Sequence, residues 1–280
     1  MIHDTILAAL RCPKCGEAVS FDGRSLFCAG ARRHCYDAAA SGYVNLAPEH
    51  RAGGDSREAV RARTAFLGRG YSAPVAEAIE ALAGEYARPG AQRERPLLCD
   101  AGCGEGYYTG RLAKYGPVCG FDLSRAAVEA GAKAARREGL DAFYAVAGLY
   151  SLPLRDGSVD FMLNHFAPCA EAEFCRVLQP GGVLVVGAAG EDHLLGLKRA
   201  IYDTPVRNEV RADLPAGMAL IERRTVRENI RIEGQADIAA LFAMTPYYYR
   251  TSEADRAKLA ALDTLETEIE VDLTVYRRDA

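Results

Sequence analysis

The chain has 280 residues, of which 49% are hydrophobic and 26% are charged, a composition typical of a globular protein rather than a disordered one. No apolar run approaches the roughly 18 residues that a membrane span needs, and the N-terminus lacks a signal-peptide pattern. We therefore expect a cytoplasmic protein without membrane contact, whose nine cysteines stay reduced or bind metal.

The charge is unevenly distributed along the chain. Residues 1–70 carry ten basic and seven acidic side chains, whereas the remaining 210 carry 24 basic and 31 acidic ones. A basic N-terminal segment on an acidic body is typical of a segment that meets a polyanion such as RNA.

The first candidate site is a pair of cysteines, Cys12 and Cys15, with the two-residue spacing of a zinc knuckle. A second group follows at Cys28, His34 and Cys35. Three cysteines with one further ligand suit tetrahedral Zn²⁺, and the fourth ligand is either His34, which we favour, or Cys35.

The segment between the two groups, residues 19–27, reads as two short strands around an Asp22-Gly23 turn. This pattern predicts a β-hairpin that brings the ligand groups together. A core this small would take its stability from the metal.

A polar stretch from residue 48 to residue 54 predicts a linker, and Asp55 with Glu58 predicts a capping box for a helix over residues 56–67. Arg57 and Arg61 lie four residues apart on this helix, and Arg63 flanks them. We expect the three arginines to contact RNA phosphates, although a solvated face with local Glu58 pairing explains them equally well.

The central motif is an apolar run that ends in Asp100 and leads through Gly102, Gly104 and Gly106 into a helical pattern. A strand, a glycine turn and a helix N-terminus form the place where α/β sheets bind nucleotide-like ligands. The G-x-G-x-G spacing and the acid before it favour S-adenosylmethionine (SAM) over a dinucleotide.

The next apolar run ends in Asp122, which is placed to accept hydrogen bonds from both ribose hydroxyls. Strand and helix patterns then alternate to residue 186, which predicts an α/β fold with a doubly wound parallel sheet. Two alternating runs at residues 225–232 and 267–276 predict an antiparallel pair at the sheet edge.

The fourth predicted strand ends at Asn164, His165 and Phe166, where a target base would lie. Asn164 offers polar groups to orient a base edge, and Phe166 offers a ring to stack on it. His165 is more simply explained as a core or solvent-facing residue, and we identify no general base.

The zinc knuckle, the motif Gly42-Tyr43-Val44-Asn45-Leu46 and the extended turn Gly104-Glu105-Gly106-Tyr107-Tyr108-Thr109 occur together in this chain. In these features the sequence resembles, over nearly its whole length, the bacterial 23S ribosomal RNA guanine-N1 methyltransferases of the RlmA type. The resemblance implies a Rossmann-like class I SAM-dependent methyltransferase sheet with a small N-terminal zinc-binding module. It also implies methyl transfer from SAM to N1 of one guanine in a 23S rRNA hairpin loop.

The resemblance also assigns residues. It implies that zinc is bound by Cys12, Cys15, Cys28 and His34. It implies that SAM is contacted by Tyr71, by the turn Gly104, Glu105 and Gly106 with the adjoining Tyr107, and by His193. The chain departs from the family pattern in a longer loop between Cys28 and His34 and in Cys35 after the histidine.

We divide the chain into a zinc-binding RNA-recognition module at residues 1–48, a linker and basic helix at 49–70, and a methyltransferase domain at 71–280. The expected partner is a 23S rRNA hairpin, and a homodimer is considered as well. The main alternative is a SAM-dependent methyltransferase of a small molecule, in which the zinc module serves as a lid or dimer element. A non-catalytic RNA-binding protein with a vestigial cofactor site is the other alternative.

Overall fold

The computed structural model describes residues 2–47, 53–91, 93–210 and 215–279. Most of the predicted linker, residues 48–52, lies outside these ranges. Among the described residues, no helix is both long enough and apolar enough to cross a membrane.

The molecule is built on one eight-stranded mixed sheet with the strand order β10-β11-β9-β8-β5-β6-β7-β4. The parallel part confirms the predicted doubly wound sheet. Its strands are β5 (Leu98–Ala101), β6 (Val118–Asp122), β7 (Ala142–Val146), β8 (Val159–His165) and β9 (Leu178–Ala189).

Helices cover both faces of this sheet. Successive side chains along each strand point to opposite faces, so the apolar core is divided between the two faces. On β5, Leu98 belongs to one apolar cluster and Cys99 to another. The first cluster includes residues of α3 (Ala73–Tyr86) and α4 (Tyr107–Leu112). The second includes α6 (Glu171–Val177), and α5 (Arg125–Glu138) packs on β6 and β7. Strands buried on both faces explain the nearly continuous apolar runs in the sequence.

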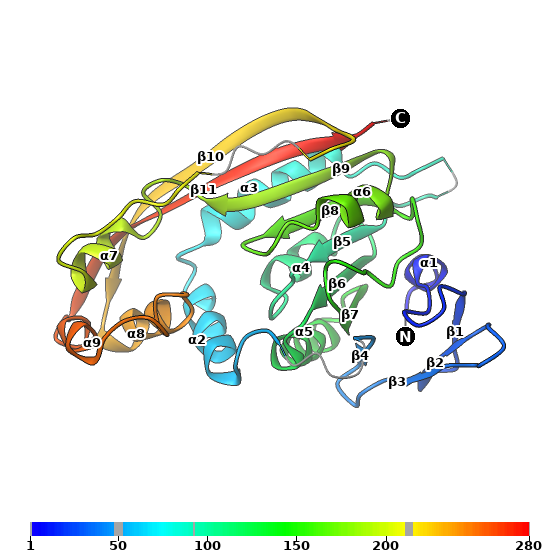
Figure 1. Cartoon of the computed structure of the whole chain (residues 1–280), viewed down its shortest axis with the longest axis horizontal. Helices are drawn as coiled ribbons and strands as arrows, with labels where there is room; N and C mark the ends of the chain where they lie inside the picture. The colour runs from blue at the N-terminus through cyan, green and yellow to red at the C-terminus, as the bar shows by residue number, and fades with distance from the viewer. Residues whose placement is uncertain (1, 48–52, 92, 211–214, 280) are drawn as a thin grey trace.

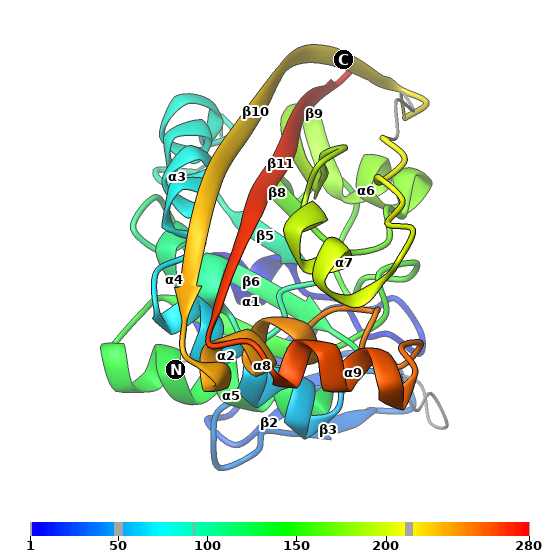
Figure 2. The same cartoon turned by 90° about the vertical axis from the view of Figure 1, so that its left-hand side faces the viewer.

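The predicted antiparallel pair forms the sheet edge, as expected, but it is longer than the alternating runs suggested. β10 (Met218–Glu233) pairs with β11 (Thr264–Arg278), which in turn pairs antiparallel with β9. Figure 1 and Figure 2 show this hairpin running along the body to the end that carries α7 (Leu195–Ile201), α8 (Gln235–Ala243) and α9 (Glu253–Ala260).

The N-terminal module packs on the opposite end of the sheet from this hairpin (Figure 1). Its three-stranded sheet, β1 (Val19–Phe21), β2 (Ser25–Cys28) and β3 (Cys35–Asp37), contains the predicted hairpin. Gly23 has a φ of +98°, and the Asp22 carboxylate accepts hydrogen bonds from the backbone N–H groups of Arg24 and Ser25. The turn residues therefore act as the sequence indicated.

The module also shares its core with the body. Leu10, which follows α1 (Asp4–Ala9), is fully buried and forms a β-bridge with Leu154. The strand β4 (Val44–Asn45) pairs parallel with β7 and so extends the main sheet. The described residues of the module, 2–47, thus pack directly on the main sheet and extend it, and our division of the chain at residue 48 stays a prediction.

One local prediction is wrong. The helix α2 (Arg57–Gly68) is capped by the Ser56 hydroxyl, which accepts the N–H of Ala59, and not by Asp55. The Asp55 carboxylate instead forms an ion pair with Arg63, and the Asp55 side chain is still half exposed. Serine and aspartate are nearly equivalent caps, so a competing ion pair is enough to shift the choice by one residue.

We expect Leu10→Ala to lower the free energy of unfolding by about 2–5 kcal/mol, because it leaves a cavity between the module and the body. Urea denaturation followed by circular dichroism should still give one transition. The control Leu220→Ala removes a side chain that is 45% exposed on β10 and should cost less than about 1 kcal/mol. A separate early transition in the wild type, or equal costs for the two variants, would contradict a shared core.

Candidate functional site

The glycine turn after β5 has a backbone that only glycine adopts easily. Gly102, Gly104 and Gly106 have φ values of +93°, +52° and +84°. A Cβ at Gly102 would lie 2.3 Å from the Ala167 Cβ, and one at Gly106 would lie 2.4 Å from the Tyr144 hydroxyl. The turn is therefore tight in conformation and also packed closely against its neighbours.

This turn forms one wall of a cavity of about 420 Å³ at the carboxyl ends of β5, β6 and β8, a size typical of ligand sites. Polar and charged side chains on its walls include Asp55, Arg63, Asp100, Glu105, Asp122, His165 and His193. Aromatic side chains on its walls are Tyr107, Tyr108, Tyr150 and Phe166.

The Asp122 carboxylate is held in place by backbone N–H groups. Gly104 donates to Oδ2 at 3.1 Å and Ser124 donates to Oδ1 at 2.7 Å. Burial raises the pKa of Asp122, while these two hydrogen bonds act in the opposite direction. Each carboxylate oxygen keeps a further lone pair, so a ribose diol could still bind there.

Asp100 lies deeper in the cavity, 2% exposed, and accepts a hydrogen bond of 2.5 Å from the Thr109 hydroxyl of α4. Burial raises the pKa of Asp100 to about 7, and the nearby Asp122 and Glu105 carboxylates add to the effect. The side chain both supports the turn and faces the cavity.

Five rings follow one another along another part of the wall: Tyr107, Tyr108, His165, Phe166 and His193. Successive ring centroids are 5.0, 4.6, 4.3 and 5.2 Å apart. Phe166 is 53% exposed and has a φ of +52°, which is uncommon for a bulky residue. Its N–H donates to the Gly187 carbonyl, so the ring is held at the cavity mouth by the fold.

Both histidines are neutral at physiological pH. Burial lowers the pKa of His165 to about 3 and that of His193 to about 4. The Glu270 N–H donates to Nδ1 of His193 at 3.2 Å, which places the proton of the neutral ring on Nε2. His193 therefore presents a hydrogen-bond donor at this wall.

The structure gathers most of the predicted cofactor residues around the cavity, while their role in binding SAM stays a prediction. Tyr71 and Gly106 are the exceptions among them, since neither lines the cavity. The Tyr71 ring stacks on Phe66 with centroids 4.9 Å apart, and Gly106 shapes the turn from behind.

The predicted substrate residues are separated in space. Phe166 lies at the cavity mouth, whereas Asn164 is fully buried and donates from Nδ2 to the carbonyl oxygens of Ala101 and Pro168. Arg57 and Arg61 are exposed on α2, and neither takes part in an ion pair among the described residues. Arg63 turns inward and lines the cavity, so it does not share their surface.

Sequence reasoning missed Asp55, Thr109 and Tyr150. Thr109 lies in the first turns of α4 and faces Asp100, a contact that its position after the glycine turn could have suggested. Tyr150 follows β7, the third parallel strand, and the rule that ligands bind at carboxyl ends of strands applies to it as well. Asp55 carried no signal, because its partner is eight residues away on a helix.

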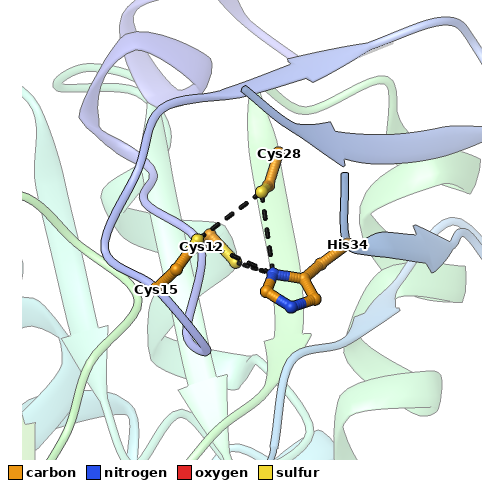
Figure 3. A group of neighbouring side chains, drawn as sticks. All are labelled: Cys12, Cys15, Cys28 and His34. Atoms are coloured by element: carbon orange, nitrogen blue, oxygen red, sulfur yellow. Dashed lines mark hydrogen bonds between the residues drawn. The ribbon is translucent and has the colours of Figure 1, made fainter. Parts of the chain in front are cut away.

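The predicted zinc ligands lie close together, from the turn before β1, the end of β2 and the residue before β3. Figure 3 shows the side chains of Cys12, Cys15, Cys28 and His34 pointing toward one common point. His34 Nδ1 lies 3.4 Å from the Cys12 sulfur and 3.7 Å from the Cys28 sulfur, and the sulfurs of Cys15 and Cys28 are 3.5 Å apart. These separations fit one tetrahedral Zn²⁺ with Zn–S of about 2.3 Å and Zn–N of about 2.0 Å.

Cys35 does not join this cluster. It is exposed on β3, and its sulfur contacts the Asp37 carboxylate at 3.7 Å. Adjacent residues at the start of a strand point to opposite sides, so only one of His34 and Cys35 can face the other three cysteines. The geometry favours His34 as the fourth ligand.

We expect the purified protein to hold about one zinc ion per chain, measured by plasma mass spectrometry. His34→Ala should lose most of this zinc, because three thiolates leave the tetrahedral site incomplete. Cys35→Ser should retain it. Retention in the first variant with loss in the second would reverse the assignment of the fourth ligand.

The raised pKa of Asp100 predicts a pH-dependent stability. An unfolded aspartate has a pKa near 3.8, so the folded protein binds the extra proton between pH 3.8 and about 7 and loses stability as the pH rises through this window. Asp100→Asn removes this loss, and its stability relative to the wild type should therefore be greater at pH 8 than at pH 5 in urea titrations.

Asp156→Asn is the control for this comparison. Its Arg176 partner lowers the pKa of Asp156, so that group is ionised in both states over this range and should add no pH dependence. An Asp100→Asn difference that does not change with pH would show that Asp100 is ionised in the folded protein throughout.

Comparisons with known proteins agree with this geometry. The family described as "Methyltransferase domain" matches residues 99–186, and the family described as "RlmA, N-terminal" matches residues 10–52. A 23S rRNA (guanine(748)-N(1))-methyltransferase of Streptomyces fradiae is 32% identical over 99% of both chains. The protein YxjB of Bacillus subtilis (strain 168), named as a candidate 23S rRNA (guanine-N(1)-)-methyltransferase, is 28% identical over 95% of both chains.

The chain thus combines a methyltransferase domain, whose sheet carries the cavity, with a zinc ribbon, which carries the cysteine–histidine cluster. The chain belongs to the family of 23S rRNA guanine-N1 methyltransferases of the RlmA type.

Proposed function

We propose that this protein transfers a methyl group from SAM to N1 of one guanine in a hairpin loop of 23S rRNA. The full-length match to the Streptomyces fradiae enzyme carries the proposal, because it spans the zinc module and the cavity together. A ribosomal RNA substrate also implies that the protein acts in the cytoplasm.

Bound SAM supplies a methyl group on a sulfonium, which is a good leaving group. The task of the chain is then to hold the reacting atoms in line at contact distance. In our proposal the glycine turn admits the methionine part of SAM, and Asp122, fixed by Gly104 and Ser124, orients the ribose. His193, whose ring proton is on Nε2, lines the same cavity.

The acceptor guanine would enter at the mouth of the cavity. Because the base lies in a hairpin loop, turning it out of the stack costs little free energy. Phe166 offers an exposed ring for stacking. Asn164 connects the loop after β8, through the Pro168 carbonyl, to the end of β5, through the Ala101 carbonyl. Burial keeps His165 and His193 neutral, so neither ring adds a positive charge to the cavity.

The RNA backbone would contact the N-terminal part of the molecule. Arg32 and Arg33 are exposed in the loop between two zinc ligands, and Arg57 and Arg61 are exposed on α2. Such contacts position the hairpin without reading its bases. A methyltransferase of a small molecule, with the zinc module as a lid or dimer element, has no use for these arginines.

The test is mapping of methylated nucleotides in 23S rRNA from a strain without this gene, and from the same strain complemented with it. We expect complementation to restore methylation at N1 of one guanine, seen by mass spectrometry and by a reverse-transcription stop. An Asp122→Ala gene should not restore it. Identical 23S rRNA in the deleted and complemented strains would favour the small-molecule alternative.

The same proposal predicts the behaviour of Arg61→Glu in vitro. Binding of a 23S hairpin fragment should weaken, and the slope of log affinity against log salt should fall by about 1, because one phosphate contact is lost. SAM affinity by calorimetry should not change. The control is Arg95→Glu. Arg95 lies on the loop before β5, at the opposite edge of the sheet from the cavity, so this substitution should leave both affinities unchanged.

A further inference from the structure

Arg63 is a cation set into the wall of the cofactor cavity. Its helix α2 packs against α5 and α8, and its side chain is 22% exposed. Nε donates to the Glu105 carboxylate and Nη1 donates to the Asp55 carboxylate, each at 2.5 Å. These two ion pairs fix the plane of the guanidinium group.

The remaining donors of Arg63 face the glycine turn. A guanidinium group has five N–H bonds, and the contacts to Glu105 and Asp55 are the only ones it makes with described residues. A Cβ added at Gly104 would lie 3.1 Å from Nη2, so this nitrogen lies directly against the turn. Nη2 therefore presents two N–H donors where the backbone allows close approach of a ligand.

The charges around the cavity are complementary to those of SAM. The amino acid part of SAM carries a carboxylate, an ammonium and a sulfonium. The cavity walls hold four acidic side chains, those of Asp55, Asp100, Glu105 and Asp122. Among the described lining residues, Arg63 is the one lysine or arginine, and burial keeps both lining histidines neutral.

A carboxylate enclosed in such a cavity needs a cationic or N–H partner, because desolvation without one is costly. The ammonium and the sulfonium of SAM can each lie near acidic side chains of the cavity wall. The carboxylate of SAM has Arg63, at the turn where the methionine part is expected.

We propose that Arg63 binds the α-carboxylate of SAM through Nη2, with Asp55 and Glu105 holding the guanidinium in position. This assigns Arg63 to the cofactor rather than to RNA phosphates, in contrast to Arg57 and Arg61 on the same helix. The product S-adenosylhomocysteine carries the same carboxylate, so the contact strengthens substrate and product binding alike. It should therefore act on KM and leave kcat nearly unchanged.

The test compares two ligands that differ only in this carboxylate, SAM and decarboxylated SAM, by calorimetry on the full-length protein. Wild-type protein should bind SAM about 10- to 100-fold more tightly, the ratio expected for a charge-assisted hydrogen bond. Arg63→Met should lose this preference, because SAM affinity falls while the affinity for decarboxylated SAM stays the same. Arg63→Lys, which keeps the charge but not the fork, should keep part of the preference.

Arg61→Met is the matched control, since it removes an exposed arginine from the same helix and should keep the full preference. A wild type that binds both ligands equally would overturn the proposal without any variant. An Arg63→Met protein that binds both ligands more weakly by the same factor would show that Arg63 supports the fold alone. The readout is cofactor binding, so the outcome does not depend on which RNA is methylated.

Discussion

The carboxyl ends of three parallel strands meet at one edge of the sheet, and the chemistry of this protein depends on that constraint. β5 delivers Asp100, β6 delivers Asp122 and β8 delivers His165 and the Phe166 ring to the same cavity. The strands are buried on both faces, so the backbone positions from which these side chains project are fixed by the core. The positive φ values of the glycine turn follow from the same geometry, because the chain must reverse directly above the sheet.

The N-terminal part of the molecule is joined to the sheet by buried apolar contacts and by ion pairs between side chains. Leu10 and Val44 place the zinc module against the sheet, and Arg63 joins α2 to the glycine turn through Glu105. Gly54 contributes to the same junction, since its backbone packs so closely on Ser124 that a Cβ would lie 2.4 Å from the Ser124 nitrogen. These contacts fix the position of the helix that displays Arg57 and Arg61 to solvent relative to the cavity.

Local sequence patterns were sufficient to predict much of the fold and of the candidate site. The strand–turn–helix at Asp100, the hairpin at Asp22-Gly23 and the Cys-x-x-Cys spacing each encode their geometry within a few residues. Long-range pairing does not have such a signal. β4 is two residues long and joins the main sheet beside β7, and Asp55 leaves its capping role to pair with Arg63. Nothing in the spacing of Arg57, Arg61 and Arg63 says which of them turns inward, because that is decided by α2 packing on α5 and α8.

The inward orientation of Arg63 relates the binding of the cofactor to the binding of RNA. In the proposed arrangement one helix carries cations for two different anions, the cofactor carboxylate on its inner face and RNA phosphates on its outer face. If SAM binds in this cavity as proposed, it brings two cationic groups and one carboxylate and so neutralises part of the negative charge of the wall. A less negative cavity repels an approaching phosphate backbone less, so binding of the cofactor should favour binding of RNA, and by linkage RNA should favour SAM. This coupling would be electrostatic and would need no movement of the helix.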